Sequence, residues 1–196
     1  PASHGALVNG LQPLCVALYA AWLSHERPSK AFWACAALGS ALVLGYALYT
    51  GAGSIQAGDL LMLGAIAVGG LGYAEGGRLA KEMGGWQVIC WALVLSLPVM
   101  TLLSVWLAPA SFSHISLSAW LCLAYVSLFS MLIGFVFWYR GLAQGGIAAV
   151  GQIQLLQPFM GLGLAALLLH EQVSWGMVLV TMAAVVCVAG AKKYAR

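Results

Sequence analysis

Residues 11–26 read LQPLCVALYAAWLSHE, and residues 156–171 read LQPFMGLGLAALLLHE, with the same residue at eight of the sixteen positions. The identities include Leu-Gln-Pro at the start and His-Glu at the end of each stretch. The stretches lie 145 residues apart, so one apolar helical unit occurs twice in the chain. In a membrane protein, an internal repeat of this kind indicates a transporter whose site lies between the two copies.

The composition indicates an integral membrane protein. Hydrophobic residues make up 63% and charged residues 7% of the 196 residues, whereas a soluble domain carries roughly 25% charged residues. Seven apolar segments approach the length of about 20 residues that a bilayer span needs. They cover residues 5–24, 30–50, 58–78, 85–107, 117–139, 147–169 and 173–191. The linkers are short, so the sequence predicts one all-α bundle of seven transmembrane helices.

The basic residues predict the orientation of these spans. All eight follow odd-numbered spans: Arg27, Lys30, Arg78, Lys81, Arg140, Lys192, Lys193 and Arg196. Because basic residues collect in cytoplasmic loops, the C-terminus is predicted to be cytoplasmic. The net charge of +3 therefore reports membrane topology and gives no reason to expect nucleic-acid binding.

The predicted orientation inverts one copy of the repeat relative to the other. The first copy runs from outside to inside and the second from inside to outside, as in the inverted repeats of secondary transporters. Residues 57–196 then form a complete five-helix repeat, and residues 1–50 hold the last two helices of an incomplete one. On this interpretation the chain is an N-terminally truncated fragment that lacks the first three of ten helices.

Several short motifs resemble those of the EamA family of the drug/metabolite transporter superfamily. In the second repeat they are Gly58-Asp59-Leu60-Leu61, Gln157-Pro158 with an apolar run to His170-Glu171, and Gly190; in the first they are Gln12-Pro13, Glu26 and Gly45. The resemblance implies ten helices in two inverted repeats. It also implies export of small metabolites or drugs across the bacterial inner membrane, as a multi-pass protein.

Amides beside prolines are the candidate lining of the substrate pathway. Proline frees a carbonyl one turn back and can kink a helix, and such gaps are tolerated at membrane depth only beside protein or a wet cavity. The alternative is that the amides join packed helices by hydrogen bonds. We expect Gln12 and Gln157 to face a shared cavity. The candidate pathway residues are Asn9, Gln12, Pro13, Gln154, Gln157, Pro158 and Gly161.

The acidic residues lie away from the centres of the predicted spans. Glu26 and Glu171 precede the second and seventh spans and are expected to support helix starts. Glu75 lies deepest and can pair with Arg78, which also reaches Glu82 in a predicted loop. Glu75 and Arg78 form either an interfacial cluster or a gate linked to proton movement. The lack of a carboxylate at mid-membrane favours neutral, zwitterionic or amphipathic substrates.

The remaining patterns have structural explanations. Tryptophans and tyrosines near the span ends, among them Tyr73, Trp138 and Tyr139, are expected to be interfacial anchors. Glycines spaced four apart, such as Gly72 and Gly76, allow helices to approach closely. No metal-ligand, nucleotide-binding or catalytic motif is present, so no cofactor, metal or enzymatic activity is expected.

The transporter interpretation has alternatives. A seven-helix membrane receptor shares the predicted topology, and a non-transport membrane protein or a membrane enzyme shares the composition. The inverted repeat favours the transporter, because a receptor needs none. The expected partners are a small-molecule substrate and the lipid bilayer, and a homodimer is left open.

Overall fold

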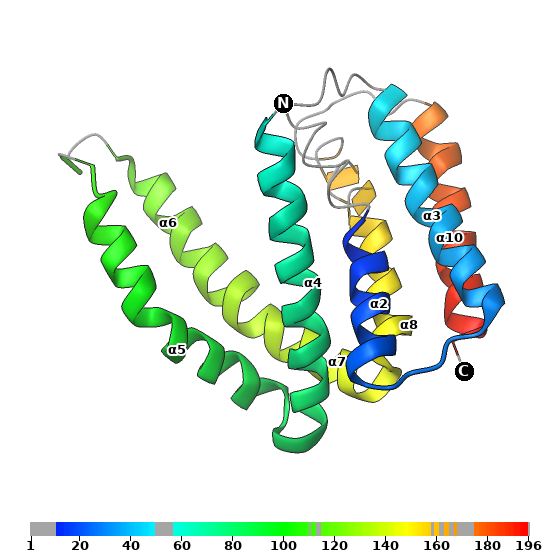
Figure 1. Cartoon of the computed structure of the whole chain (residues 1–196). Coiled ribbons are helices and arrows are strands. Elements are labelled where there is room, and N and C mark those ends of the chain that lie inside the picture. Colours follow the sequence, from blue (N-terminus) through cyan, green and yellow to red (C-terminus); the bar gives the residue numbers. More distant parts are fainter. Residues whose placement is uncertain are drawn as a thin grey trace. The chain divides into compact units, whose positions relative to one another are not determined.

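The computed structural model describes residues 11–49, 57–109, 111–112, 115–157, 159–160, 163–164, 167 and 175–195. The described elements are helical and include no strand (Figure 1). The chain divides into two compact units, unit 1 with residues 1–75 and 145–196 and unit 2 with residues 76–144. These units differ from the predicted repeats, which are defined by sequence similarity and not by compactness.

In unit 1, elements of the predicted first and sixth spans pack together, as do elements of the second and seventh. The helix α2 (Gln12–Leu23) packs on α8 (Ile147–Gly151) and the 3-10 helix η2 (Gln152–Leu156), and α3 (Lys30–Tyr49) packs on α10 (Trp175–Lys193). Figure 1 draws α3 and α10 side by side. Helices from spans that the sequence predicts to be equivalent are therefore packing partners, and the division into repeats stays a prediction.

The paired helices of unit 1 run in opposite directions. Ser29, which precedes α3, donates its hydroxyl to the carbonyl of Tyr194, which follows α10, at 2.7 Å. Glu26, just past the end of α2, bonds the start of α8. Each helix thus begins where its partner ends, which is the arrangement that an inverted repeat requires.

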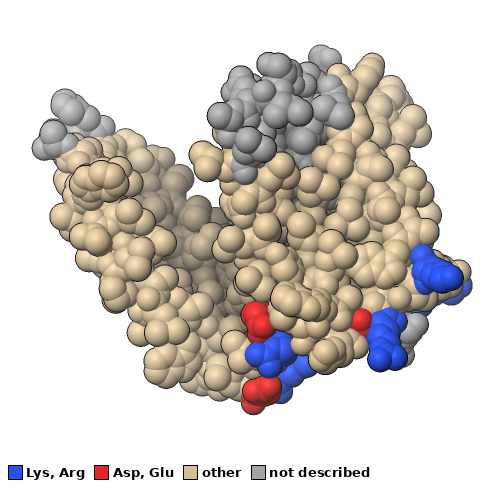
Figure 2. All heavy atoms as spheres, in the orientation of Figure 1, with Lys and Arg blue, Asp and Glu red and all other residues tan. Residues whose placement is uncertain are grey.

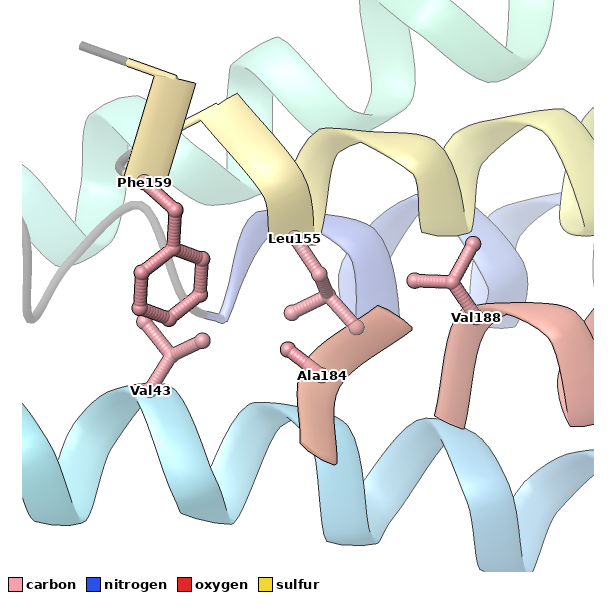
Figure 3. Close-up of a cluster of buried hydrophobic side chains, with 5 residues drawn as sticks. All are labelled: Val43, Leu155, Phe159, Ala184 and Val188. Atoms are coloured by element: carbon pink, nitrogen blue, oxygen red, sulfur yellow. The ribbon is translucent and has the colours of Figure 1, made fainter. Parts of the chain in front are cut away.

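The core of unit 1 lies where α3, η2 and α10 meet. Val43 of α3, Leu155 of η2, Phe159, and Ala184 and Val188 of α10 form one buried cluster (Figure 3). Close packing beside it depends on small residues. A Cβ added at Gly39 of α3 would lie 2.7 Å from Leu155 Cδ1.

Unit 2 joins the end of α4 (Ala57–Met83) to a long apolar hairpin. Its first arm is α5 (Gly85–Trp106), and its second arm is continuous from α6 (Leu117–Tyr125) through the π-helical η1 (Val126–Gly134) to α7 (Phe135–Gly145). Ser116 caps the second arm, because its hydroxyl accepts the N–H of Ala119 at 3.2 Å. A Cβ added at Gly85 would lie 2.7 Å from the Val136 carbonyl oxygen, so this glycine lets the two arms approach.

Within the described residues, two helices are long and apolar enough to cross a membrane. They are Gly85–Trp106 and Leu117–Gly145, and their most apolar stretches are almost wholly exposed. Shorter apolar helices cover Gln12–Leu23, Lys30–Tyr46 and Ile147–Leu156. The all-helical fold is compatible with a membrane transporter, and the number of seven spans stays a prediction.

Two helices continue past the predicted ends of their apolar spans, so the expected position of Glu82 in a loop was wrong. The third span was predicted to end at residue 78, but α4 reaches Met83 and includes Glu82, which was expected in a loop. The fifth was predicted to end at residue 139, but α7 reaches Gly145. In both helices, residues that follow the apolar stretch, including charged ones, still belong to the helix. The helices end at Gly84 (φ +94°) and Gly146 (φ +87°), where the backbone enters a region that favours glycine.

The charged side chains gather at helix ends in both units (Figure 2). In unit 1 they lie at the α2–α3 link and at the end of α10, where Lys192 and Lys193 occupy the last turn. In unit 2 they lie at the turn between α4 and α5. The helix surfaces between these ends are largely apolar.

Candidate functional site

Three polar side chains from three elements meet inside unit 1. The hydroxyl of Tyr73, on α4, is hydrogen-bonded by the side chains of Gln12 on α2 and Gln154 on η2. A Cβ added at Gly69 of α4 would lie 3.4 Å from Gln12 Nε2, so the missing side chain leaves room for this amide. We call Gln12, Tyr73 and Gln154 the amide–phenol cluster. It joins α2 to η2, and thus joins the two copies of the repeat.

A fourth polar residue, Gln152, supports this cluster. Its side chain is fully buried, and its Nε2 donates to the carbonyl oxygen of Pro13 at 3.1 Å. The sequence interpretation missed Gln152 because the residue 145 positions earlier, Leu7, is apolar. A usable signal was present, since three glutamines lie within Gln152–Gln157 in an otherwise apolar segment.

Two amide oxygens of these residues are buried without a donor in the described part of the chain. They are the Oε1 atoms of Gln152 and Gln154. A buried amide oxygen that lacks a hydrogen bond costs about 1–3 kcal/mol, so such atoms are normally satisfied by protein, water or ligand. The site can therefore accept hydrogen bonds from N–H or O–H groups. Its named members contribute amides and a phenol and no formal charge.

The local backbone presents these amides. Pro158, which lies outside the described residues, has no N–H to donate to the Gln154 carbonyl one turn back. The chain before it forms the 3-10 helix η2 in place of a regular α-helix. Because Gln152 and Gln154 are two residues apart in this helix, their side chains face different neighbours, Pro13 and Tyr73 respectively.

The other predicted pathway residues are distributed differently. Gln12 and Gln154 come together at Tyr73, and Pro13 is buried at the start of α2. Gln157 is exposed, and no described contact joins it to Gln12. Asn9, Pro158 and Gly161 lie outside the described residues. That these residues line a substrate pathway stays a prediction.

The predicted gate residues lie on α4. Glu75 is half-buried, and Arg78 pairs with Glu82 at 3.9 Å, one of the two pairings that the spacing allowed. The side chains of this pair are 42% and 69% exposed, so the pair contributes little to stability. A role of Glu75 or Arg78 in gating stays a prediction.

Glu26 supports a helix start, but not that of the helix which follows it. Its two carboxylate oxygens accept the backbone N–H groups of Ile147 and Ala148, each at 2.9 Å. These N–H groups begin α8 and have no acceptor within their own helix. Glu26 thus caps a helix that lies 121 residues away in sequence. Glu171, its counterpart in the second copy, lies outside the described residues.

Two tyrosines expected to be interfacial anchors have inward roles. Tyr73 belongs to the amide–phenol cluster, and Tyr139 is buried against α4, where a Cβ added at Gly76 would overlap its ring. Gly76 therefore permits the close approach that the glycine spacing predicted, whereas a Cβ at Gly72 would meet open space. Trp22 and Trp175 are 70% and 82% exposed, as anchors in a lipid interface would be.

The chain matches the EamA-like transporter family over residues 56–191. It also shares 57% identity over 194 residues with the uncharacterized transporter YdeK of Bacillus subtilis (strain 168), covering 99% of this chain and 68% of that protein. The chain belongs to the EamA-like transporter family.

The fold of this EamA-family protein also occurs in a solved crystal structure. The two superimpose with a TM-score of 0.79 at 20% sequence identity, over 97% of this chain and 68% of the other. This likeness concerns the fold alone. The family and the named relative identify a multi-pass membrane transporter, in preference to the receptor or the enzyme that the composition alone allowed.

Proposed function

We propose that this EamA-family protein exports small organic solutes across the bacterial inner membrane by alternating access. The amide–phenol cluster is the observation that carries the proposal. It places uncharged hydrogen-bonding groups between the two copies of the repeat, where transporters built from repeats bind their substrates. The solute would be neutral, zwitterionic or amphipathic, and it would present N–H or O–H groups to the amide oxygens.

The repeat architecture supports the alternating-access part of this proposal. Residues 57–196 would be one complete repeat, which agrees with the family match to residues 56–191, and residues 1–50 would belong to the other. The antiparallel pairing of α2 with α8 and of α3 with α10 is what two inverted repeats would form. Rocking of one repeat against the other would expose the cluster to each side in turn.

The basic residues support an orientation for the same protein. Arg27 and Lys30 lie at the α2–α3 link, next to the end of α10 that carries Lys192 and Lys193. Under the positive-inside rule this end of unit 1 would be cytoplasmic, and the C-terminus with it. A homodimer stays open.

The first experiment identifies the solute and then tests the cluster. Metabolite profiles of a deletion strain and an overexpressing strain would name the exported compound, whose efflux is then measured for Tyr73→Phe and Gln154→Leu. We expect about a 5- to 30-fold loss for each, since each removes a hydrogen-bonding group worth about 1–2 kcal/mol in a buried site. The control Tyr19→Phe makes the same change on α2, at a tyrosine outside the cluster, and should retain normal efflux.

A double variant tests the prediction that Gln12 and Gln157 face a shared cavity. If Gln12 and Gln157 both contact the solute, their double alanine variant should lose efflux. Normal efflux from that variant and from Tyr73→Phe, at wild-type expression, would remove the amide–phenol cluster from the pathway.

A further inference from the structure

Unit 2 contains an open cavity of about 520 Å³ at the turn between α4 and α5, with both polar and apolar lining residues. Lys81, in the last turn of α4, and Arg140, on α7, both line it. Its described lining includes no carboxylate. Two cations from separate helices thus face one space, and the electrostatic potential in that space favours an anion.

The start of α5 adds backbone donors to the same cavity. Gly84 holds the cap position and offers no side-chain cap, and the N–H of Val88 is the first to bond back to the Gly84 carbonyl, at 3.2 Å. The N–H groups at positions 85–87 therefore have no acceptor within their own helix. A helix start of this kind attracts negative charge. Gln87 and Gln144 contribute amide groups to the lining.

The surroundings of the cavity indicate which anion it takes. Trp86 lines it and is 60% exposed, and Trp91, further along α5, is 58% exposed. Tryptophan on a lipid-facing helix marks the level of the headgroups, and the exposed apolar face of α5 begins directly beyond it. A molecule with an anionic head and apolar chains matches both features.

We propose that this cavity binds the phosphate headgroup of an anionic phospholipid, with the acyl chains lying along α5. Basic pockets between transmembrane helices hold such headgroups in other proteins. The positive-inside rule alone needs basic residues at helix ends but needs no shared cavity. Lys30 and Lys192 illustrate the difference, since both are exposed at helix ends and neither lines this cavity.

The test is native mass spectrometry of the whole transporter in detergent micelles, titrated with phosphatidylglycerol. We expect retention of the lipid by the wild type and roughly 30-fold weaker binding by the double variant Lys81→Gln/Arg140→Gln, from the usual attraction per basic residue near anionic headgroups. The matched control is Lys30→Gln/Lys192→Gln, which also removes two charges and should bind as the wild type does. Phosphatidylethanolamine should bind weakly to all of them.

A second variant keeps the result interpretable if the neutralised protein misfolds. Ala143→Phe fills the cavity and leaves both cations in place, and it should also lose the lipid. Equal phosphatidylglycerol binding by the wild type and either cavity variant would overturn the proposal, as would equal retention of the zwitterionic lipid. Complete displacement by millimolar inorganic phosphate would assign the site to a free phosphate and overturn the lipid as its source.

Discussion

Replacing Glu26 by alanine should destabilise unit 1 far more than its position in a link between helices suggests. The carboxylate accepts two N–H groups at 2.9 Å, from Ile147 and Ala148, and it is half-buried. Hydrogen bonds to a charged group contribute about 1.5–3 kcal/mol each, and loss of a helix cap costs about 0.5–2 kcal/mol. Because water can reach part of this site, we expect a loss of about 2 kcal/mol in the free energy of unfolding.

The measurement is reversible unfolding of the purified protein by sodium dodecyl sulfate, followed by circular dichroism. A loss of about 2 kcal/mol lowers the ratio of folded to unfolded protein roughly 30-fold. Glu26→Gln keeps an acceptor oxygen but not the charge, so it should lose about half as much. Glu82→Ala is the control, since its exposed pair with Arg78 at 3.9 Å should contribute less than about 0.5 kcal/mol. If Glu26→Ala unfolds at the same detergent concentration as Glu82→Ala, the interhelical cap is not what holds α2 to α8.

Three further substitutions test the packing and the site. Gly85→Ala should cost about 1–3 kcal/mol in the same unfolding assay, because its Cβ would lie 2.7 Å from a backbone oxygen of α7; Gly72→Ala, with open space around it, should be neutral or stabilising. Gln152→Met keeps a similar volume but removes the donor to the buried Pro13 carbonyl, so it should cost about 1–3 kcal/mol in the free energy of unfolding. It should also reduce efflux of the identified solute, and unchanged efflux would contradict a role for this amide. Ser116→Ala should cost about 0.5–1 kcal/mol by removing the cap of α6, which the unfolding midpoint reports.

The repeat and the charges predict which helices are equivalent and that the two repeats are inverted, and the antiparallel packing of α2 on α8 and of α3 on α10 is consistent with that prediction. The stretch that begins at Leu11 lies on α2, which packs on η2, and η2 ends at Leu156, where the second stretch begins. Such a prediction is possible because identities at a fixed offset and basic residues at span ends are properties of the linear sequence.

The partners of the polar groups could not be predicted in the same way. Tyr73 lies near the end of an apolar segment, where the usual interpretation is an anchor, and only the packing of three elements brings it to Gln12 and Gln154. Glu26 was expected to support a helix start, but the sequence gives no reason to choose a helix 121 residues away. The ends of α4 and α7 were missed because hydropathy reports where the hydrocarbon ends and not where helical hydrogen bonding stops.

The two ends of α5 differ in how well they should tolerate an insertion, because a single residue, Gly84, connects α5 to α4. α4 ends at Met83 and α5 begins at Gly85, so the chain reverses within one residue whose φ of +94° suits glycine. At the other end of α5, residues 107–116 separate it from α6. An epitope tag or a fluorescent label therefore belongs in residues 107–116. The same asymmetry predicts that natural length variation in this family accumulates there and is absent around the glycine.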